Sequence, residues 1–459
     1  MKKIIMIVAA VLMLSAPATM AQKINAETYQ GKLEKSDQAI ANEKKAAKAA
    51  TWIARGNTYV EALEAPTKDL YVGMDLNILT LACGEPKKKG MEEIRGTEYQ
   101  TLNYPYFKAY TLNGKLAGWK VTKFIHEDAD QIAFEAYAKA YELDLKLAAK
   151  VKTGMDKLTN YEAQIGDISN TLSDYVRGAE AYIKVYEIQS HESIGNADPM
   201  MLYYAGYMYT IGANDDSSLY ATGVDVLNRA VEAGYPEVEL ADTEVDDKDK
   251  GNIYYYLYHC YYGQKDADAA NVIRAKEALV KGVEVFPKNQ RILDALTQLY
   301  TTEEGIGDPS ELIVMIDTAI KADPTNADLW FGRGRIYFSL QDYDNCIDSF
   351  LEVTRLAPDL FDGHFYLGLF YIYKGDALNE EISSKSYTEN AAYEQDIKEA
   401  NAVYATAIPV LERAHELRPD DLSTVEYLKS LCFRLRDEDG IMDKYTQYNT
   451  LFNDLKDRQ

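Results

Sequence analysis

Histidine, cysteine and tryptophan are scarce in this sequence, with 5, 4 and 3 residues among 459. So few histidines and cysteines leave little room for a metal centre with imidazole or thiolate ligands. Basic residues are also outnumbered, because 49 lysines and arginines face 73 acidic residues and give a net charge of −24. Nucleic acid and anionic membrane surfaces both need a basic face. We therefore expect no metal, no other cofactor and no nucleic-acid partner.

The sequence also lacks the short motifs of common catalytic sites. It contains no GxSxG, no HExxH and no GxxxxGK[ST]. The acidic run 246–251 resembles a calcium loop, but Lys248 and Lys250 occupy two of its ligand places, and a lysine cannot bind a cation. Acidic pairs are too frequent in this chain to indicate a glycosidase. We expect a protein that is not an enzyme, and carboxylate catalysis remains the third hypothesis for its function.

The first 21 residues have the three parts of a secretory signal peptide. Lys2 and Lys3 precede the apolar run 4–14, and small residues at 15–21 end at Ala21, where cleavage is expected. Eleven apolar residues are too few to span a bilayer, and no later stretch is apolar enough to do so. We expect the mature chain in the periplasm, or secreted or at the cell surface, with no membrane insertion. The four cysteines are expected to be buried free thiols.

A period of 34 residues organises much of the chain, and it is clearest between Pro324 and Pro358. Small residues in this pattern let paired helices approach closely, large residues fill the gap between them, and the proline ends the second helix. If Ala327 opens a unit, the large, small and proline positions are occupied by Trp330, Gly334, Tyr337, Phe350 and Pro358.

This pattern resembles the tetratricopeptide repeat (TPR) family over about two-thirds of the mature chain, counted by matched units. The resemblance implies a mainly α fold, an α-solenoid with a small α+β insertion that contains a β-hairpin near the N-terminus. It is also similar in style to exported repeat proteins of Gram-negative envelopes, which bind proteins or peptides. The expected organisation is a signal peptide at 1–21, an N-terminal helical repeat at 22–66, the α+β insertion at 67–125, irregular helical repeats at 126–195, TPR units at 196–419 and capping helices at 420–459.

The insertion departs from the helical pattern. A short apolar helix is expected at 75–83, then a basic loop at 87–89, and then strands at 99–104, 106–112 and 115–121. Asn-Gly between the last two strands is a strong hairpin signal, because both turn residues tolerate positive φ. The segment is similar to the small BamE-like modules of outer-membrane assembly lipoproteins, or else it is a hairpin that decorates the solenoid. The matching residues are Gly73, Met74, Gly84, Pro86, Tyr110, Asn113, Gly114 and Trp119.

The first helices of a TPR array line its concave face, and here that face is rich in aromatic residues and poor in lysine. Such a groove suits an extended peptide, an apolar helix or a sugar ring. We predict a scaffold for a protein or peptide partner, and the alternatives are a glycan-binding protein of the cell envelope or simple packing between repeats. The candidate binding residues are Tyr203, Tyr207, Tyr255, His259, Tyr262, Phe331, Arg335, Phe365 and Tyr373.

Overall fold

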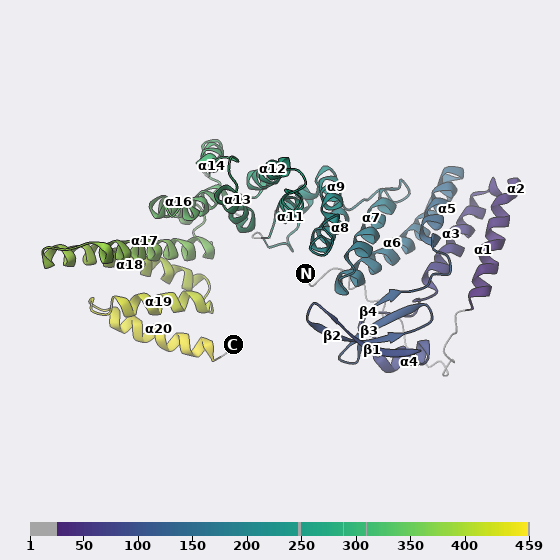
Figure 1. Ribbon diagram of the computed structural model, residues 1–459, viewed down its shortest axis with the longest axis horizontal. Coiled ribbons are helices and arrows are strands. Elements are labelled where there is room, and N and C mark those ends of the chain that lie inside the picture. The colour runs from purple at the N-terminus through teal and green to yellow at the C-terminus, as the bar shows by residue number, and fades with distance from the viewer. Residues whose placement is uncertain (1–24, 247–248, 288, 309, 458–459) are drawn as a thin grey trace. The chain divides into compact units, whose positions relative to one another are not determined.

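The chain is built mainly from antiparallel pairs of α-helices, with one small sheet (Figure 1). The structure is a computed structural model, and it describes residues 25–246, 249–287, 289–308 and 310–457. The expected signal peptide lies outside these residues. Contacts divide the chain into unit 1, Met1–Ala233, and unit 2, Gly234–Gln459, and each unit is described by itself. The expected fold class is confirmed as a mainly α protein of paired helices with a small α+β insertion.

Unit 1 holds three close helix pairs, which are α3 with α5, α6 with α7, and α8 with α9. Its helices are α1 (Ala26–Ala41), α2 (Glu43–Ala46), α3 (Ala49–Glu64), α4 (Leu76–Cys83), α5 (Ala129–Leu143), the 3₁₀ turn η1 (Leu145–Leu147), α6 (Ala148–Thr171), α7 (Tyr175–Ser190), α8 (Pro199–Gly212) and α9 (Leu219–Glu232).

The α+β insertion lies between the two helices of a single repeat. The α3 helix pairs with α5, although more than sixty residues separate them in the sequence. Tyr137 of α5 is fully buried against Gly56 of α3, and its hydroxyl donates a 2.8 Å hydrogen bond to Asn57 Oδ1. The first repeat is therefore completed only after the insertion, by a helix that the sequence pattern alone does not assign to it.

The sheet is a four-stranded antiparallel meander in the order β1-β2-β3-β4. Its strands are β1 (Lys88–Ile94), β2 (Thr97–Asn103), β3 (Phe107–Leu112) and β4 (Lys115–Val121). The Asn113-Gly114 turn joins β3 to β4 with φ of 52° and 76°, as its residue types predict. The expectation of a basic loop at 87–89 is wrong, because Lys88 and Lys89 begin β1. The turn that joins β1 to β2 is Arg95-Gly96. Both of its residues also have positive φ, but Arg-Gly is not a common turn pair.

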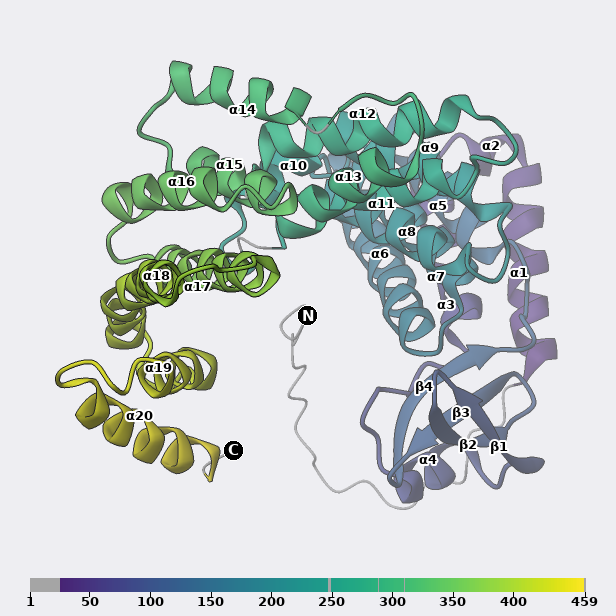
Figure 2. The ribbon, with the colours of Figure 1, turned by 60° about the vertical axis from the view of Figure 1, so that its left-hand side comes forward.

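One face of the sheet packs on α4, and β4 packs on the end of α6 (Figure 2). Leu79 of α4 and Leu102 of β2 are almost completely buried in this small core. Gly118 of β4 brings its backbone close to Ile168 and Leu172, so a side chain at this position would meet both. These contacts fix the sheet to the long helix of the next repeat.

Unit 2 continues the helix pairs with α11 and α12, α15 and α16, α17 and α18, and α19 and α20. Its helices are α10 (Tyr235–Ala241), α11 (Asn252–Tyr262), α12 (Ala270–Val285), α13 (Gln290–Thr302), α14 (Ser310–Ala322), α15 (Ala327–Ser339), α16 (Tyr343–Leu356), α17 (Phe361–Ser384), α18 (Asn390–Leu417), α19 (Leu422–Arg434) and α20 (Ile441–Lys456).

A hydrogen bond at the start of a first helix explains one position of the repeat pattern. The indole of Trp330 donates a 3.1 Å bond to the carbonyl oxygen of Pro324, six residues earlier. Trp52 makes the same bond to Ala46 O at 2.7 Å, and His364 makes it to Pro358 O at 2.9 Å. A ring N–H at this position therefore fixes the angle at which the chain enters the helix.

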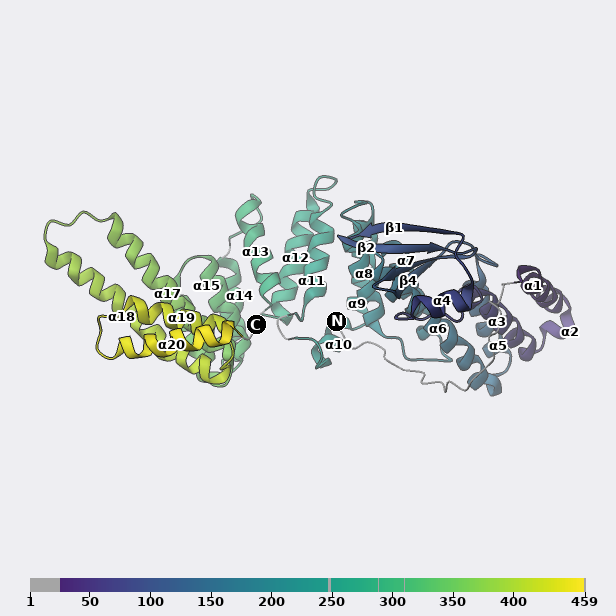
Figure 3. The ribbon, with the colours of Figure 1, turned by 90° about the horizontal axis from the view of Figure 1, so that it is seen from below.

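The polar segment 376–396 forms part of one long helix pair. The segment extends both helices of one pair, so that α17 reaches Ser384 and α18 starts at Asn390 (Figure 3). Gly375 and Tyr404 pack together in the extension, and the Tyr404 hydroxyl accepts a 2.9 Å hydrogen bond from Asn379. Polar residues are compatible with a helix here because the long pair leaves much of its surface in solvent.

We predict that Gly56→Ala destabilises unit 1. The added Cβ would lie 2.5 Å from the Tyr137 ring, which cannot move away because Gly154 supports its other side. Overpacking costs about 1–3 kcal/mol, which exceeds the gain of up to about 1 kcal/mol from alanine in a helix. Thermal or denaturant unfolding should show a net loss of about 1–2 kcal/mol. Gly31→Ala in α1 is the control, because nothing lies within 4 Å of its Cβ, and unchanged or higher stability is expected there. Equal effects of the two changes would contradict the packing argument.

Candidate functional site

Aromatic side chains of unit 2 gather on the first helices of successive pairs. Residues three, four, seven or eight apart on a helix share one face. On α15 this face carries Phe331, Arg335 and Phe338, and on α17 it carries Phe365 and Tyr373. The members of this face differ in how far neighbouring elements cover them.

Phe331 and Arg335 are buried, each with only 8% of its surface exposed. The Phe331 ring packs 4.8 Å from Phe350 and edge-on, at 5.6 Å, against Tyr366 of α17. Arg335 forms an ion pair with Asp294 of α13 at 3.2 Å, and its guanidinium lies over the Tyr366 ring. A partner could touch either residue only after these neighbours moved, so both residues join the repeats to one another in the structure as it stands.

Phe365 and Tyr373 are half-buried and remain accessible in part. The Phe365 ring lies 6.0 Å from Tyr427 of α19. Tyr373 lies 5.4 Å from Phe338 and 6.3 Å from Tyr343. Burial raises the pKa of Tyr427, and the charge of an ionised Tyr373 would raise it further. We call the five half-buried residues Phe338, Tyr343, Phe365, Tyr373 and Tyr427 the aromatic surface.

Three further candidates form a separate group on α11. The Tyr255 ring stands edge-on to His259 at 4.5 Å, and burial lowers the pKa of His259. The Tyr262 hydroxyl donates a 2.5 Å hydrogen bond to Glu303, which also binds Lys265 at 2.8 Å. The α13 helix contacts both α11 and α15, so it lies between this group and the aromatic surface.

The last two candidates, Tyr203 and Tyr207, belong to unit 1 and are half-buried on α8. The Tyr203 ring lies 5.6 Å from Tyr204, which in turn lies 5.6 Å from Tyr182 of α7. The nine predicted residues thus fall into three groups. Phe331, Arg335, Phe365 and Tyr373 lie on α15 and α17, Tyr255, His259 and Tyr262 lie on α11, and Tyr203 and Tyr207 lie on α8 of the other unit.

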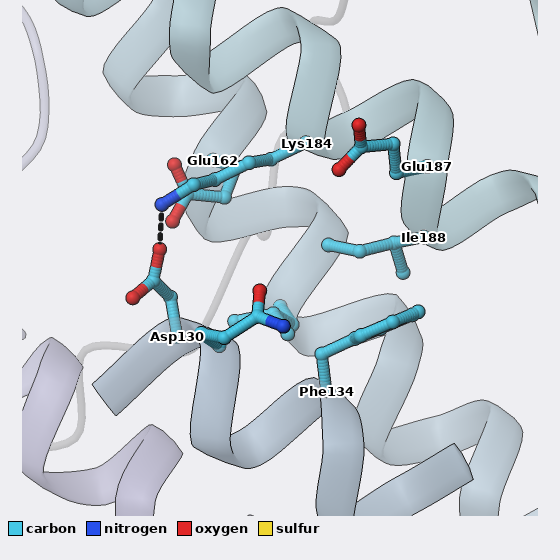
Figure 4. A pocket seen from close by; sticks show the side chains of 8 residues that line it. Asp130, Phe134, Glu162, Lys184, Glu187 and Ile188 are labelled. Atoms are coloured by element: carbon cyan, nitrogen blue, oxygen red, sulfur yellow. Dashed lines mark hydrogen bonds and ion pairs between the residues drawn. The ribbon is translucent and has the colours of Figure 1, made fainter. Parts of the chain in front are cut away.

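A small pocket in unit 1 was missed by the sequence reasoning. Its volume is about 20 Å³, enough for one water-sized group. Figure 4 shows how α5, α6 and α7 supply its side chains, and how Lys184 binds Asp130 across it. We call it the Glu162 pocket, and its lining residues are Asp130, Gln131, Phe134, Leu158, Glu162, Lys184, Glu187 and Ile188.

Glu162 is the unusual residue of this pocket. It is completely buried, and within the described part of the chain neither carboxylate oxygen has a hydrogen-bond partner. The Arg177 guanidinium lies 3.8 Å from Oε2, too far for a hydrogen bond. Burial raises the pKa of Glu162 to about 7, against the opposing effect of Arg177. One sequence signal could have found it, because Glu162 falls on the buried stripe of α6 between Leu158 and Ile165.

The described residues contain neither a candidate metal site nor a candidate membrane-spanning helix. No cluster of three or more histidine, cysteine or acidic side chains is arranged there for a metal ion. Cys260, Cys346 and Cys432 are buried, Cys83 is half-buried, and all four are thiols outside disulfide bonds in the described residues. Among the helices described, none combines the length and the apolar character that crossing a bilayer requires. The calcium-like run 246–251 lies partly outside the described residues.

No protein-family model and no curated protein matches the chain. Several solved structures are similar to it. A TPR repeats protein from Bacteroides fragilis is 13% identical, with 60% of this chain and 97% of that one covered and a TM-score of 0.26. The TPR2AB domain of yeast Sti1 in complex with pHSP90 is 15% identical, with 66% of this chain and 99% of that one covered and a TM-score of 0.23.

The human IFIT1 dimer with m7Gppp-AAAA is 12% identical to this chain, with 70% of each chain covered and a TM-score of 0.30. Two of these three proteins are TPR proteins by name. With identities under 25% and TM-scores under 0.5, the likenesses do not indicate what this chain binds.

We predict that Glu162→Gln makes stability less dependent on pH. The pKa of Glu162 rises from 4.5 to about 7 on folding, so between these values the folded state keeps a proton that the unfolded state releases. Stability conferred by the protonated acid is full below about pH 4.5 and declines as pH rises to 7, by about 3 kcal/mol in total. Denaturant unfolding at pH 5 and pH 8 should show that the variant lacks this decline.

Glu34→Gln is the matched control, because Glu34 is an exposed acid on α1 of the same unit and is not among the charges that shift the pKa of Glu162. It should keep the decline of the unmodified chain. If Glu162→Gln and the unmodified chain lost the same stability between the two pH values, the decline could not be attributed to buried Glu162.

Proposed function

We propose that this chain is a non-enzymatic scaffold that works outside the cytoplasm and binds a protein or peptide through the aromatic surface of unit 2. The observation that carries the proposal is the set of half-buried rings on α15, α16, α17 and α19, each of which contacts a neighbouring ring and is still partly accessible. Such rings add contact area with little loss of side-chain entropy, because each has few rotatable bonds.

The chemistry of this surface favours a partner with apolar side chains. Hydrophobic side chains of an extended peptide or an amphipathic helix can lie on ring faces and edges, and the tyrosine hydroxyls can pair with polar groups at the rim. Lysine and arginine are not part of the aromatic surface as defined, which argues against recognition of a free carboxylate terminus. The location outside the cytoplasm rests on the signal-peptide pattern of residues 1–21 alone.

The insertion supplies a second contact surface in this proposal. Ile78 and Leu81 of α4 have 39% and 63% of their surface exposed, while Leu79 between them is buried in the small core. An exposed apolar pair on a helix anchored by a buried neighbour is suited to a protein contact. The similarity to BamE-like modules is consistent with such a role in the cell envelope.

The aromatic surface is tested by Tyr373→Ala and Tyr427→Ala. Each change removes a ring but little of the core, so the variants should fold while binding weakens by about 1–3 kcal/mol, or roughly five- to 150-fold. Partners are first captured from an envelope extract and identified by mass spectrometry. Dissociation constants are then measured with the purified partner.

Tyr393→Ala is the control, because Tyr393 of α18 is 45% exposed and lies outside the aromatic surface. Its partner binding should match that of the unmodified chain. If the tyrosine variants kept full affinity for the protein partner, the aromatic surface would be excluded. Loss of binding to a glycan array, with no protein partner found, would instead favour the glycan alternative.

The second surface is tested by Leu81→Glu. Because Leu81 is mostly exposed, the thermal unfolding temperature should change little, whereas a charge inside an apolar contact should release any partner held by α4. Thr97→Glu, on β2 of the same sheet, serves as a charge control. Co-purification that is insensitive to Leu81→Glu would remove the insertion from the binding proposal.

A further inference from the structure

The Glu162 pocket combines a buried acceptor with a cavity beside it. Glu162 is completely buried, and within the described residues no protein donor reaches either of its oxygens. A carboxylate can accept about four hydrogen bonds, and leaving such acceptors unmatched in a protein interior is costly. The pocket therefore presents strong acceptors to any small donor that enters it.

The charges around the pocket favour a cation over a neutral donor. Asp130, Glu162 and Glu187 line it with three carboxylates, against the single ammonium group of Lys184. That ammonium is bound to Asp130 and its charge also acts on Glu162, so one positive charge is shared between two carboxylates. Arg177 lies 3.8 Å from Glu162 outside the lining. With all five groups ionised, the three carboxylates and the two basic side chains carry one net negative charge, which one further positive charge would neutralise.

Size and wall chemistry limit which cation fits. A volume of about 20 Å³ admits a group the size of a water molecule, which an –NH₃⁺ head matches and a planar guanidinium or a quaternary ammonium exceeds. Phe134, Leu158 and Ile188 provide apolar walls for an alkyl stem. Gln131 and Glu187 are exposed, so the pocket is open to solvent on their side.

We propose that the Glu162 pocket binds a primary alkylammonium group, carried either by a lysine side chain of a partner protein or by a small free amine. Three N–H donors on one tetrahedral head can meet Glu162 together with acceptors nearer the opening, such as Glu187. The site lies in unit 1 and does not depend on the aromatic surface of unit 2.

The binding is expected to depend on pH because Glu162 must be ionised to hold the cation. Burial raises the pKa of Glu162 to about 7, so binding below that pH has to displace a proton. The other charged groups facing it are Asp130 of α5 and Arg177, Glu180 and Lys184 of α7, and the Tyr161 phenol lies beside it. Affinity should therefore rise about tenfold from pH 6 to pH 8.

The experiment titrates the whole chain with n-butylammonium chloride at constant ionic strength, followed by calorimetry or NMR. We expect saturable binding at pH 8 with a dissociation constant on the order of 1 mM, as suits so small a ligand. Tetramethylammonium and guanidinium should bind at least about tenfold more weakly, because both exceed the cavity. Absence of saturable butylammonium binding at pH 8 would overturn the proposal.

Variants tie the binding to the pocket. Glu162→Gln should weaken butylammonium binding by about tenfold or more and remove its pH dependence, and an unfolding curve checks that the variant is folded. Glu34→Gln, an equal charge change at an exposed acid of α1 in the same unit, should bind like the unmodified chain. Equal binding by Glu162→Gln would overturn the proposal.

A second arm separates the two sources of the ammonium group. A blocked Gly-Lys-Gly peptide should bind at least as well as butylammonium if the natural ligand is a partner's lysine, and its Nε-acetyl-lysine form should not bind. Butylammonium binding without binding of the lysine peptide would assign the pocket to a small free amine. These results do not depend on Tyr373 or Tyr427, so failure of the aromatic surface and failure of this site are distinguishable.

Discussion

The close approach of two helices at a glycine is the contact on which the repeats depend. Gly56, Gly206, Gly334 and Gly368 each lie on the first helix of a pair, where a Cβ would come within 2.5 Å of a large side chain of the second helix. Those partners are Tyr137, Leu227, Phe350 and Leu411. A glycine thus creates the space, and a buried large residue fills it to the density of a protein interior. Once this contact is made, the remaining faces of the first helix are open to other uses.

Because the contact requires only that two helices meet, it tolerates chain inserted between or beyond them. The sheet and α4 lie between α3 and α5, yet the pair still closes around Tyr137. The pair α17 and α18 is lengthened instead, and Gly375 with Tyr404 repeats the same contact farther along. Loop closure over a longer insertion costs little more than over a short one, since the entropy grows only with the logarithm of length. Added surfaces can therefore arise without loss of the repeat.

Residue spacing predicts the repeated contacts well and the covering of a surface poorly. Gly334, Trp330 and Phe350 follow from the pattern because each depends on neighbours within its own unit. The burial of Phe331 and Arg335 depends instead on Tyr366 and Asp294, which come from other helices at no fixed spacing. Strand β1 was missed because its turn, Arg95-Gly96, takes positive φ at a residue that seldom adopts it. The partner of α3 was missed because it lies beyond the insertion.

Glu162 departs from the rule that makes the rest of the fold predictable. Met155, Leu158 and Ile165 occupy the same buried stripe of α6, and a leucine at 162 would continue it at no electrostatic cost. A buried acid stabilises a fold only when its hydrogen bonds and charge are matched, and among the residues that the structure describes the matching groups for Glu162 are incomplete. Packing alone therefore does not account for an acid at this position. A function in which the carboxylate meets a donor from outside the chain accounts for both its burial and the cavity beside it.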